Sequence, residues 1–183
     1  MRKVTEGRNF VKVLTYSGIC VALSAVLASV KLFNLPQGGS VTACSMLFIV
    51  LVGYWFGARA GVTAGVVLSL IRLAMGDPFY HPVELILDYP LAFGVLGFGG
   101  MFGRAKFSLQ LGYAVCALLR FVCSFVAGFV FFGSYAPAGQ NVFVYSALYN
   151  LSYILPEMII TLIIISLPPV RAVIERIGAD AAL

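Results

Sequence analysis

The sequence predicts an all-α integral membrane protein with six transmembrane helices and both termini in the cytoplasm. Three observations lead to this prediction. The 183 residues are 61% hydrophobic and only 10% charged, a balance that soluble domains of this size do not have. The apolar residues gather into six blocks, and the basic residues concentrate in alternate connections between them. We therefore expect a single membrane domain over residues 1–183, with no room for a second, soluble one.

The six apolar blocks are expected to form the transmembrane helices, because a helix needs roughly 20 mainly apolar residues to cross a bilayer. Turn-forming residues separate the blocks, as in Pro36 to Ser40, Gly76 to Pro78 and Pro137 to Asn141. Pro168 and Pro169 end the last block, and an amphipathic tail follows. The blocks cover 11–30, 41–56, 61–75, 83–102, 109–132 and 142–167.

The distribution of lysine and arginine predicts how the chain is oriented in the membrane. Nine of these residues fall in the N-terminal arm, in two alternate connections and in the tail, whereas Lys31 alone falls in the other connections. Cytoplasmic loops carry such an excess, so both ends are expected to face the cytoplasm. The net charge of +5 then reflects topology, and nucleic-acid binding is not expected.

Motifs of several other functions are missing from the sequence. The four cysteines lie within apolar blocks without CxxC spacing, so neither a disulfide framework nor a zinc site is expected. No GxxxxGK(S/T) loop occurs, which excludes ATP binding of the P-loop kind. The basic N-terminus leads into further membrane segments, and we expect it to be retained.

Two carboxylates in the fourth block are the strongest indication of function. Glu84 and Asp88 lie four residues apart, a spacing that places both on one face of a helix. Acidic groups at membrane depth are costly unless paired or hydrated, so these two should line a polar cavity. Their mutual repulsion requires a shared proton, an arginine or a bound cation. Pairing with Arg72 or Arg120 inside the bundle is the alternative to a ligand site, and we favour pairing for Arg120.

Polar and aromatic side chains in the fifth and sixth blocks add to this candidate site. Hydrogen bonds between helices and an aromatic belt at the interface are their ordinary explanations. Their convergence toward the outer half of the bundle instead favours a flat heteroaromatic cation, held by stacking and cation–π attraction. The aromatic run covers 129–135, and the sixth block contributes Tyr145, Ser146, Tyr149, Asn150, Tyr153 and Glu157.

Four segments, in order along nearly the whole chain, carry a specific resemblance. They are Leu35 to Val41, Leu87 to Tyr89, Phe131 to Pro137 and Tyr145 to Asn150. Together they resemble the thiamine-specific S component of energy-coupling factor transporters. The resemblance implies a six-helix substrate-binding membrane subunit with a solvent-facing pocket under its first loop. It also implies partners, namely a transmembrane coupling subunit and two cytoplasmic ATPase subunits, and no resident cofactor.

The resemblance assigns ligand contacts to residues of this sequence. Asp88 would accept hydrogen bonds from an aminopyrimidine and offset the charge of the cation, and Phe132 would stack on a ring. The first loop would act as a lid, and a small-xxx-small pair, Gly18 and Ala22, would bind the coupling subunit. The expected ligand-binding residues are Gly39, Tyr80, Glu84, Asp88, Tyr89, Ser124, Gly128, Phe132, Tyr145, Tyr149 and Asn150.

Four positions depart from the family pattern. Ser124 stands where relatives can carry a histidine against the ligand, and Phe132 stands where a tryptophan stacks. Gly39 replaces a tryptophan of some relatives, and Asp88 replaces a glutamate. A phenyl ring attracts a cation less strongly than an indole does. These changes bear on the identity and affinity of the ligand more than on the fold.

We therefore expect a subunit of the bacterial cell membrane, not an enzyme, that captures thiamine or a close relative from outside for ATP-driven uptake. Two other classes of function stay open at this point. An intramembrane enzyme could use His81, Glu84 and Asp88 as acid, base and metal ligand. A ligand-independent membrane scaffold would need none of them.

Overall fold

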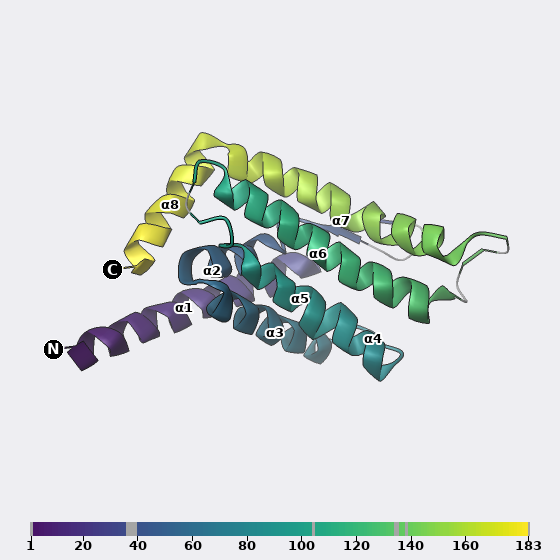
Figure 1. The fold of residues 1–183 in the computed structure, drawn as a ribbon, viewed down its shortest axis with the longest axis horizontal. Helices are drawn as coiled ribbons and strands as arrows, with labels where there is room; N and C mark the ends of the chain where they lie inside the picture. Colours follow the sequence, from purple (N-terminus) through teal and green to yellow (C-terminus); the bar gives the residue numbers. More distant parts are fainter. Residues whose placement is uncertain (1, 36–39, 104, 134–135, 138, 183) are drawn as a thin grey trace.

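The computed structural model describes residues 2–35, 40–103, 105–133, 136–137 and 139–182. It is an elongated helical bundle in which the two termini lie at the same end (Figure 1). Within these described ranges, three helical segments are long and apolar enough to cross a membrane by themselves: Phe10–Ser29 in the first helix, Ser108–Phe131 and Val142–Ser166. The predicted all-α membrane class is confirmed, whereas the count of six crossings and the cytoplasmic termini stay predictions.

Shorter elements fill the space between and beside these long helices. The elements in chain order are α1 (Arg2–Ser29), β1 (Lys31–Asn34), β2 (Ser40–Thr42), α2 (Leu47–Phe56), α3 (Ala58–Ala74), α4 (Pro82–Ile86), η1 (Leu87–Leu91), α5 (Ala92–Gly94), η2 (Val95–Phe98), α6 (Ser108–Phe131), α7 (Val142–Ser166) and α8 (Pro168–Ala182).

Glycines let the short helices pack closely in the centre of the bundle. A Cβ atom on Gly53 of α2 or on Gly61 of α3 would collide with the carbonyl oxygen of Gly97 in η2. Gly57 joins α2 to α3 with a φ of 86°, a backbone conformation that side chains with a Cβ rarely adopt. The backbones of three elements therefore meet with no side chain between them.

The fourth apolar block is not the regular helix that the sequence predicts. After α4 the chain makes a π-helical turn, η1, which contains Pro90. Proline has no N–H, and its ring clashes with the carbonyl four residues earlier in an α-helix. The wider turn avoids this clash, and the N–H of Ala92 bonds to the carbonyl of Leu87, five residues earlier. Asp88 and Tyr89 both lie within η1.

A small antiparallel hairpin joins α1 to α2, where the sequence predicts a loop followed directly by a helix. β1 pairs with β2, and Lys31 lies opposite Thr42. The apolar block predicted as helical from residue 41 begins its helix only at Leu47. Val41 and Thr42 are β-branched, a feature that favours strands.

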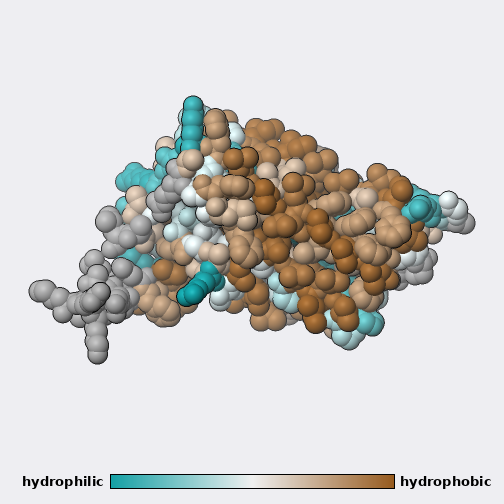
Figure 2. All heavy atoms as spheres, viewed as in Figure 1, coloured by the Kyte–Doolittle hydropathy of each residue, from teal (hydrophilic) through white to brown (hydrophobic). Residues whose placement is uncertain are grey.

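The surface and the C-terminal end agree with a protein that sits in a bilayer. Figure 2 shows hydrophobic residues over the middle of the visible face and hydrophilic residues nearer its two ends. As predicted, α7 ends before the two prolines, and α8 starts at Pro168. The indole N–H of Trp55 donates to the carbonyl of Ile174, 3.2 Å away, and so fixes α8 to α2.

Candidate ligand-binding site

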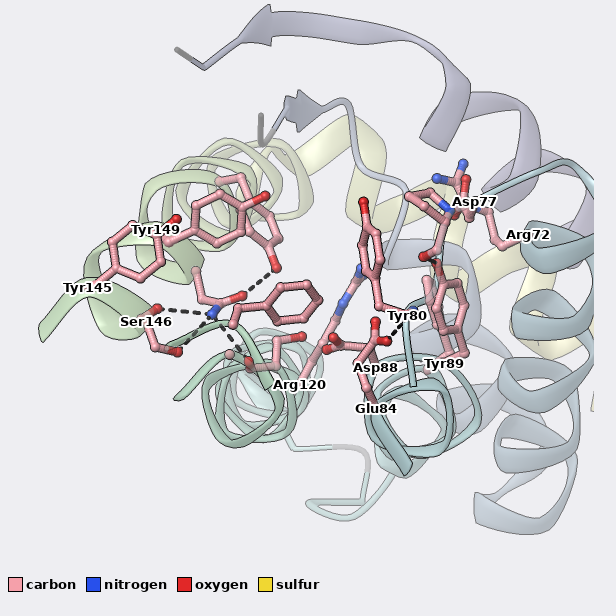
Figure 3. A pocket seen from close by; sticks show the side chains of 17 residues that line it. Arg72, Asp77, Tyr80, Glu84, Asp88, Tyr89, Arg120, Tyr145, Ser146 and Tyr149 are labelled. Atoms are coloured by element: carbon pink, nitrogen blue, oxygen red, sulfur yellow. Dashed lines mark hydrogen bonds and ion pairs between the residues drawn. The ribbon is translucent and has the colours of Figure 1, made fainter. Parts of the chain in front are cut away.

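A cavity of about 480 Å³ lies between α4, η1, α6 and α7. Small-molecule sites in proteins typically measure about 300 to 1,000 Å³. Figure 3 shows acidic and basic side chains near the middle of this cavity and tyrosines around it. The lining residues are Arg72, Asp77, Pro78, Tyr80, Glu84, Asp88, Tyr89, Phe93, Arg120, Ser124, Gly128, Phe132, Tyr145, Ser146, Tyr149, Asn150 and Tyr153.

The cavity brings together every described residue of the predicted ligand-binding set. Gly39 lies outside the described residues. Sequence reasoning did not place Asp77, Pro78 or Phe93 at the site. Asp77 and Pro78 belong to a turn that the sequence predicts between two apolar blocks. An acidic residue in the turn that leads into α4 was the signal that could have placed this turn at the site.

Glu84 is buried and bonded to the start of its own helix. Its Oε2 accepts hydrogen bonds from the backbone N–H groups of Tyr80, at 2.7 Å, and His81, at 3.0 Å. The Nδ1 atom of His81 accepts a hydrogen bond from the N–H of Val83 at 3.2 Å, which completes a capping box. Backbone dipoles at this helix end therefore stabilise the charge of Glu84. Capping also accounts for His81, which the enzyme hypothesis would use in catalysis.

Asp88 presents its carboxylate to the cavity (Figure 3). It is half-buried, and it interacts with the Ser124 hydroxyl of α6. Among the residues that the structure describes, ion pairs shorter than 4.0 Å join Arg72 to Asp77 and Arg171 to Glu175. Asp88 therefore lines the cavity without an ion pair shorter than 4.0 Å among the described residues.

The two arginines at the cavity do not clamp the carboxylates of Glu84 and Asp88. Arg72 Nε lies 2.7 Å from Asp77 Oδ2, just beyond the end of α3. The guanidinium of Arg120 lies over the ring of Phe93, with Cζ 4.4 Å from the ring centroid. Its Nε is buried without a hydrogen-bond partner among the described residues. The predicted pairing of Arg120 with an acidic residue is therefore wrong, because this side chain packs on an aromatic face instead.

The formal charges around the cavity do not cancel. Among the described lining residues, three carry a carboxylate and two carry a guanidinium, which leaves one uncompensated negative charge in this set. An unpaired charge is costly at membrane depth. A ligand with a single positive charge would neutralise the cavity.

Aromatic rings give the cavity flat faces. The ring of Tyr80 meets that of Phe132 edge to face, with centroids 5.7 Å apart. On α7, Tyr145 and Tyr149 are stacked with centroids 6.2 Å apart. Rings of this kind bind planar ligands and attract cations to their faces.

Two of the predicted ligand contacts also hold the protein together. The Tyr89 hydroxyl donates to the carbonyl of Pro78 at 2.8 Å, so it fixes the connection between α3 and α4. Asn150 Nδ2 donates to the carbonyl of Ser124 in α6, at 3.2 Å, and its Oδ1 accepts from the Tyr153 hydroxyl at 2.6 Å. The bond from Asn150 to Ser124 joins α7 to α6, and such bonding between helices is the ordinary explanation that the sequence left open for these polar side chains. A role of either side chain in ligand binding stays a prediction.

Gly128 lines the cavity at the contact between α6 and α7. A Cβ atom at this position would collide with Ser146 Oγ. Ser146 Oγ itself donates to the carbonyl of Phe125 at 2.8 Å. The glycine therefore permits the close approach that lets both helices line one cavity.

The helical membrane bundle and its charged, aromatic cavity are those of a membrane protein that binds a small molecule, and comparison with known proteins specifies the family. Residues 14–175 match the family model described as Thiamine transporter protein (Thia_YuaJ), and the chain belongs to this family. The thiamine transporter ThiT of Bacillus subtilis (strain 168) is 33% identical over 180 residues, which cover 90% of this chain and 93% of that protein. The thiamine transporter ThiT of Lacticaseibacillus paracasei is 31% identical over 122 residues, which cover 59% of this chain and 60% of that protein.

The fold is also similar to a solved structure of ThiT from Listeria monocytogenes. The TM-score is 0.70 at 23% sequence identity, and the match covers 86% of this chain and 94% of that chain. The family consists of transporters rather than enzymes. Membership of this family and the apolar helices together identify the protein as a multi-pass bacterial membrane protein.

Proposed function

We propose that this protein is the substrate-binding subunit of an energy-coupling factor importer and captures thiamine from outside for ATP-driven uptake. The observation that carries this proposal is the single uncompensated negative charge of an aromatic cavity. Thiamine matches it, because the molecule is a monocation with two flat rings, a positive thiazolium and an aminopyrimidine that donates hydrogen bonds. Membership of the thiamine transporter family supports the same ligand.

Asp88 is the central ligand contact in this proposal. It accepts hydrogen bonds from the aminopyrimidine, and bonds to a charged acceptor are stronger than neutral ones. Phe132 stacks on a ligand ring, with Tyr80 as its neighbour at the same edge of the cavity. Tyr145 and Tyr149 cover the other face, and the Ser124 hydroxyl beside Asp88 reads a polar edge of the ligand.

The energy for uptake has to come from other subunits, since the sequence holds no P-loop. Gly18 and Ala22 are exposed on α1, and no atom lies within 4 Å of a Cβ built on Gly18. Leu14 and Val26, which lie one turn before and one turn after this pair, are 63% and 62% exposed. Small residues let a second helix approach closely. We assign this strip of α1 to the coupling subunit, which works with two cytoplasmic ATPase subunits.

Two measurements test the proposal. Thiamine is first titrated into the detergent-purified protein by calorimetry, and one thiamine is expected to bind per chain and to be recovered unchanged. The protein is then reconstituted in vesicles with the coupling and ATPase subunits, and uptake of labelled thiamine is expected only with ATP on the ATPase side. Absence of binding would refute the ligand assignment, and conversion of thiamine would favour an enzyme. Tight binding without ATP-dependent uptake by the complete complex would contradict the importer role.

A further inference from the structure

A second buried polar cluster lies outside the ligand cavity, where the hairpin meets α7. At its centre is Glu157, which is 4% exposed. Its carboxylate accepts three hydrogen bonds: Thr42 Oγ1 donates to Oε2 at 2.7 Å, and Ser45 Oγ and Met46 N donate to Oε1 at 2.8 and 3.2 Å. None of these four residues, which we call the Glu157 clasp, is among those that line the cavity.

The clasp holds the short turn that connects the hairpin to α2. Thr42 is the last residue of β2, and Met46 directly precedes α2. Ser24 of α1 holds the same turn from another side, because its Oγ donates to the carbonyl of Ser45 at 2.7 Å. Buried side chains from two helices therefore fix the base of the hairpin.

The backbone of this turn needs such support. Cys44 has a φ of 56° and is, among the described residues other than glycine, the one with a positive φ. Non-glycine residues seldom adopt this conformation, and it persists where the surrounding structure imposes it. The hydrogen bonds from Thr42 and Ser45 to Glu157 act on both sides of Cys44.

The position of the clasp connects the hairpin to the ligand cavity. In Figure 3 the two strands lie on the other side of the cavity from α6 and α4. The helix that carries Glu157 also carries Asn150 and Tyr153, which line the cavity two turns and one turn earlier. The buried carboxylate thus holds the hairpin against the same helix that contributes one wall of the cavity.

We propose that Glu157 is a positioning residue that sets how long thiamine stays bound. The clasp keeps the hairpin against α7, and without it the hairpin separates from α7 more often and opens that side of the cavity. Contacts between ligand and cavity are unchanged, so easier opening accelerates dissociation and association by similar factors and leaves the affinity nearly unaltered. The inference rests on the proposed function, because its main readout is thiamine release.

Two substitutions separate the hydrogen bonds of Glu157 from its charge. Glu157→Gln keeps the bonds, because its oxygen accepts from Ser45 and Met46 while its amide N–H donates to Thr42 Oγ1. Thr42 Oγ1 can then donate to Ser45 Oγ, 3.0 Å away. Glu157→Leu removes every acceptor at a similar volume. Ser152→Ala is the matched control, since it removes a part-buried hydroxyl of α7 that bonds within its own helix, to the carbonyl of Tyr149.

Release of labelled thiamine into an excess of unlabelled thiamine gives the dissociation rate constant of each purified variant. Glu157→Leu is expected to raise this constant about tenfold or more and to raise the association rate constant by a similar factor, so that Kd changes less than about threefold. Glu157→Gln and Ser152→Ala are expected to stay within about twofold of the unmodified protein, because they keep the clasp. An unchanged dissociation rate constant in Glu157→Leu would overturn the proposal, as would equal acceleration in Glu157→Gln.

Hydrogen exchange of residues 40–46 provides a readout that needs no ligand. Faster exchange there in Glu157→Leu, with unchanged exchange in α6, is expected if the clasp holds the hairpin. Faster exchange with unaltered thiamine release would refute the link to ligand residence. Should Glu157→Leu fail to fold, the pair Thr42→Val and Ser45→Ala removes the two side-chain bonds from the hairpin side, leaves the bond from Met46 N, and is expected to accelerate release as well. If the unmodified protein binds no thiamine, the proposed function fails, whereas the exchange experiment still tests the clasp.

Discussion

Replacement of Asp88 by asparagine tests the charge of the cavity at its centre. The substitution keeps the size of the side chain and changes the formal charge of the cavity from one negative unit to zero. The charged thiazolium lies one ring beyond the aminopyrimidine, and at about 7 Å and an effective dielectric constant near 20, suitable for a half-buried group, the attraction between a carboxylate and a cation is about 2 kcal/mol. Part of this is offset by desolvation, and a hydrogen bond to a charged acceptor contributes about 1.5 to 3 kcal/mol. We therefore expect Asp88→Asn to weaken thiamine binding by about 2 to 4 kcal/mol, or roughly 30- to 1,000-fold.

Calorimetry with the detergent-purified protein measures this loss. Glu157→Gln is the matched control, since it makes the same change from acid to amide at a buried site outside the cavity. A neutral analogue of thiamine, with an uncharged ring in place of the thiazolium, separates charge from shape. Asp88→Asn is expected to weaken binding of the analogue less than that of thiamine, because both ligands lose the bond to the aminopyrimidine and only thiamine also loses the attraction between charges. A Kd for thiamine within about twofold of the unmodified protein, or equal losses for both ligands, would refute the electrostatic reasoning.

Three further predictions concern the rest of the site. Tyr89→Phe removes the hydrogen bond to Pro78 and is expected to lower the free energy of unfolding by about 0.5 to 1.5 kcal/mol. The affinity for thiamine, measured by calorimetry, is expected to change little because the ring remains. A large loss of affinity with unchanged stability would contradict this structural role of Tyr89. Phe132→Trp is expected to tighten thiamine binding a fewfold, because indole is the better cation–π partner, and weaker binding in a well-folded variant would argue against stacking at this position. Gly18→Leu is expected to abolish ATP-dependent uptake in vesicles and to leave thiamine affinity unchanged, since Gly18 lies on the open surface of α1. Full uptake by this variant would exclude the strip of α1 around Gly18 and Ala22 as the binding surface for the coupling subunit.

The long helices could be predicted from the sequence because their signal is strong and local. The blocks at 109–132 and 142–167 match α6 and α7 to within a residue at each end. The hairpin could not be predicted in the same way. Its strands are three and four residues long, and the apolar residue Val41 continues into the block that forms α2.

The π-helical turn was missed although its cause is visible in the sequence. Pro90 follows Asp88 and Tyr89 directly, and an interior proline disrupts an α-helix. Whether the chain kinks, ends or widens there depends on the packing of α5 and η2 against α3 and α6, which periodicity does not reveal. The carboxylate spacing nevertheless predicted that the two side chains share a cavity, and both Glu84 and Asp88 line the one described.

The membership of the candidate site could be predicted, whereas its internal bonding could not. The resemblance named residues on α4, η1, α6 and α7 that the fold brings to one cavity. The partners of Arg72 and Arg120 depend on contacts that form only in three dimensions, an ion pair across the end of α3 and a face of Phe93. The role of Glu157 likewise depends on a turn more than 100 residues earlier in the chain.

The structure of the protein with thiamine bound, determined by crystallography or cryo-electron microscopy, is the most direct test of whether Asp88 and the aromatic cavity bind the ligand. We expect the ligand to occupy the cavity between α4, η1, α6 and α7, with its aminopyrimidine hydrogen-bonded to Asp88 and one of its rings stacked against Phe132. Thiamine bound elsewhere, or bound in this cavity with Asp88 paired to Arg120 and turned away from the ligand, would contradict it.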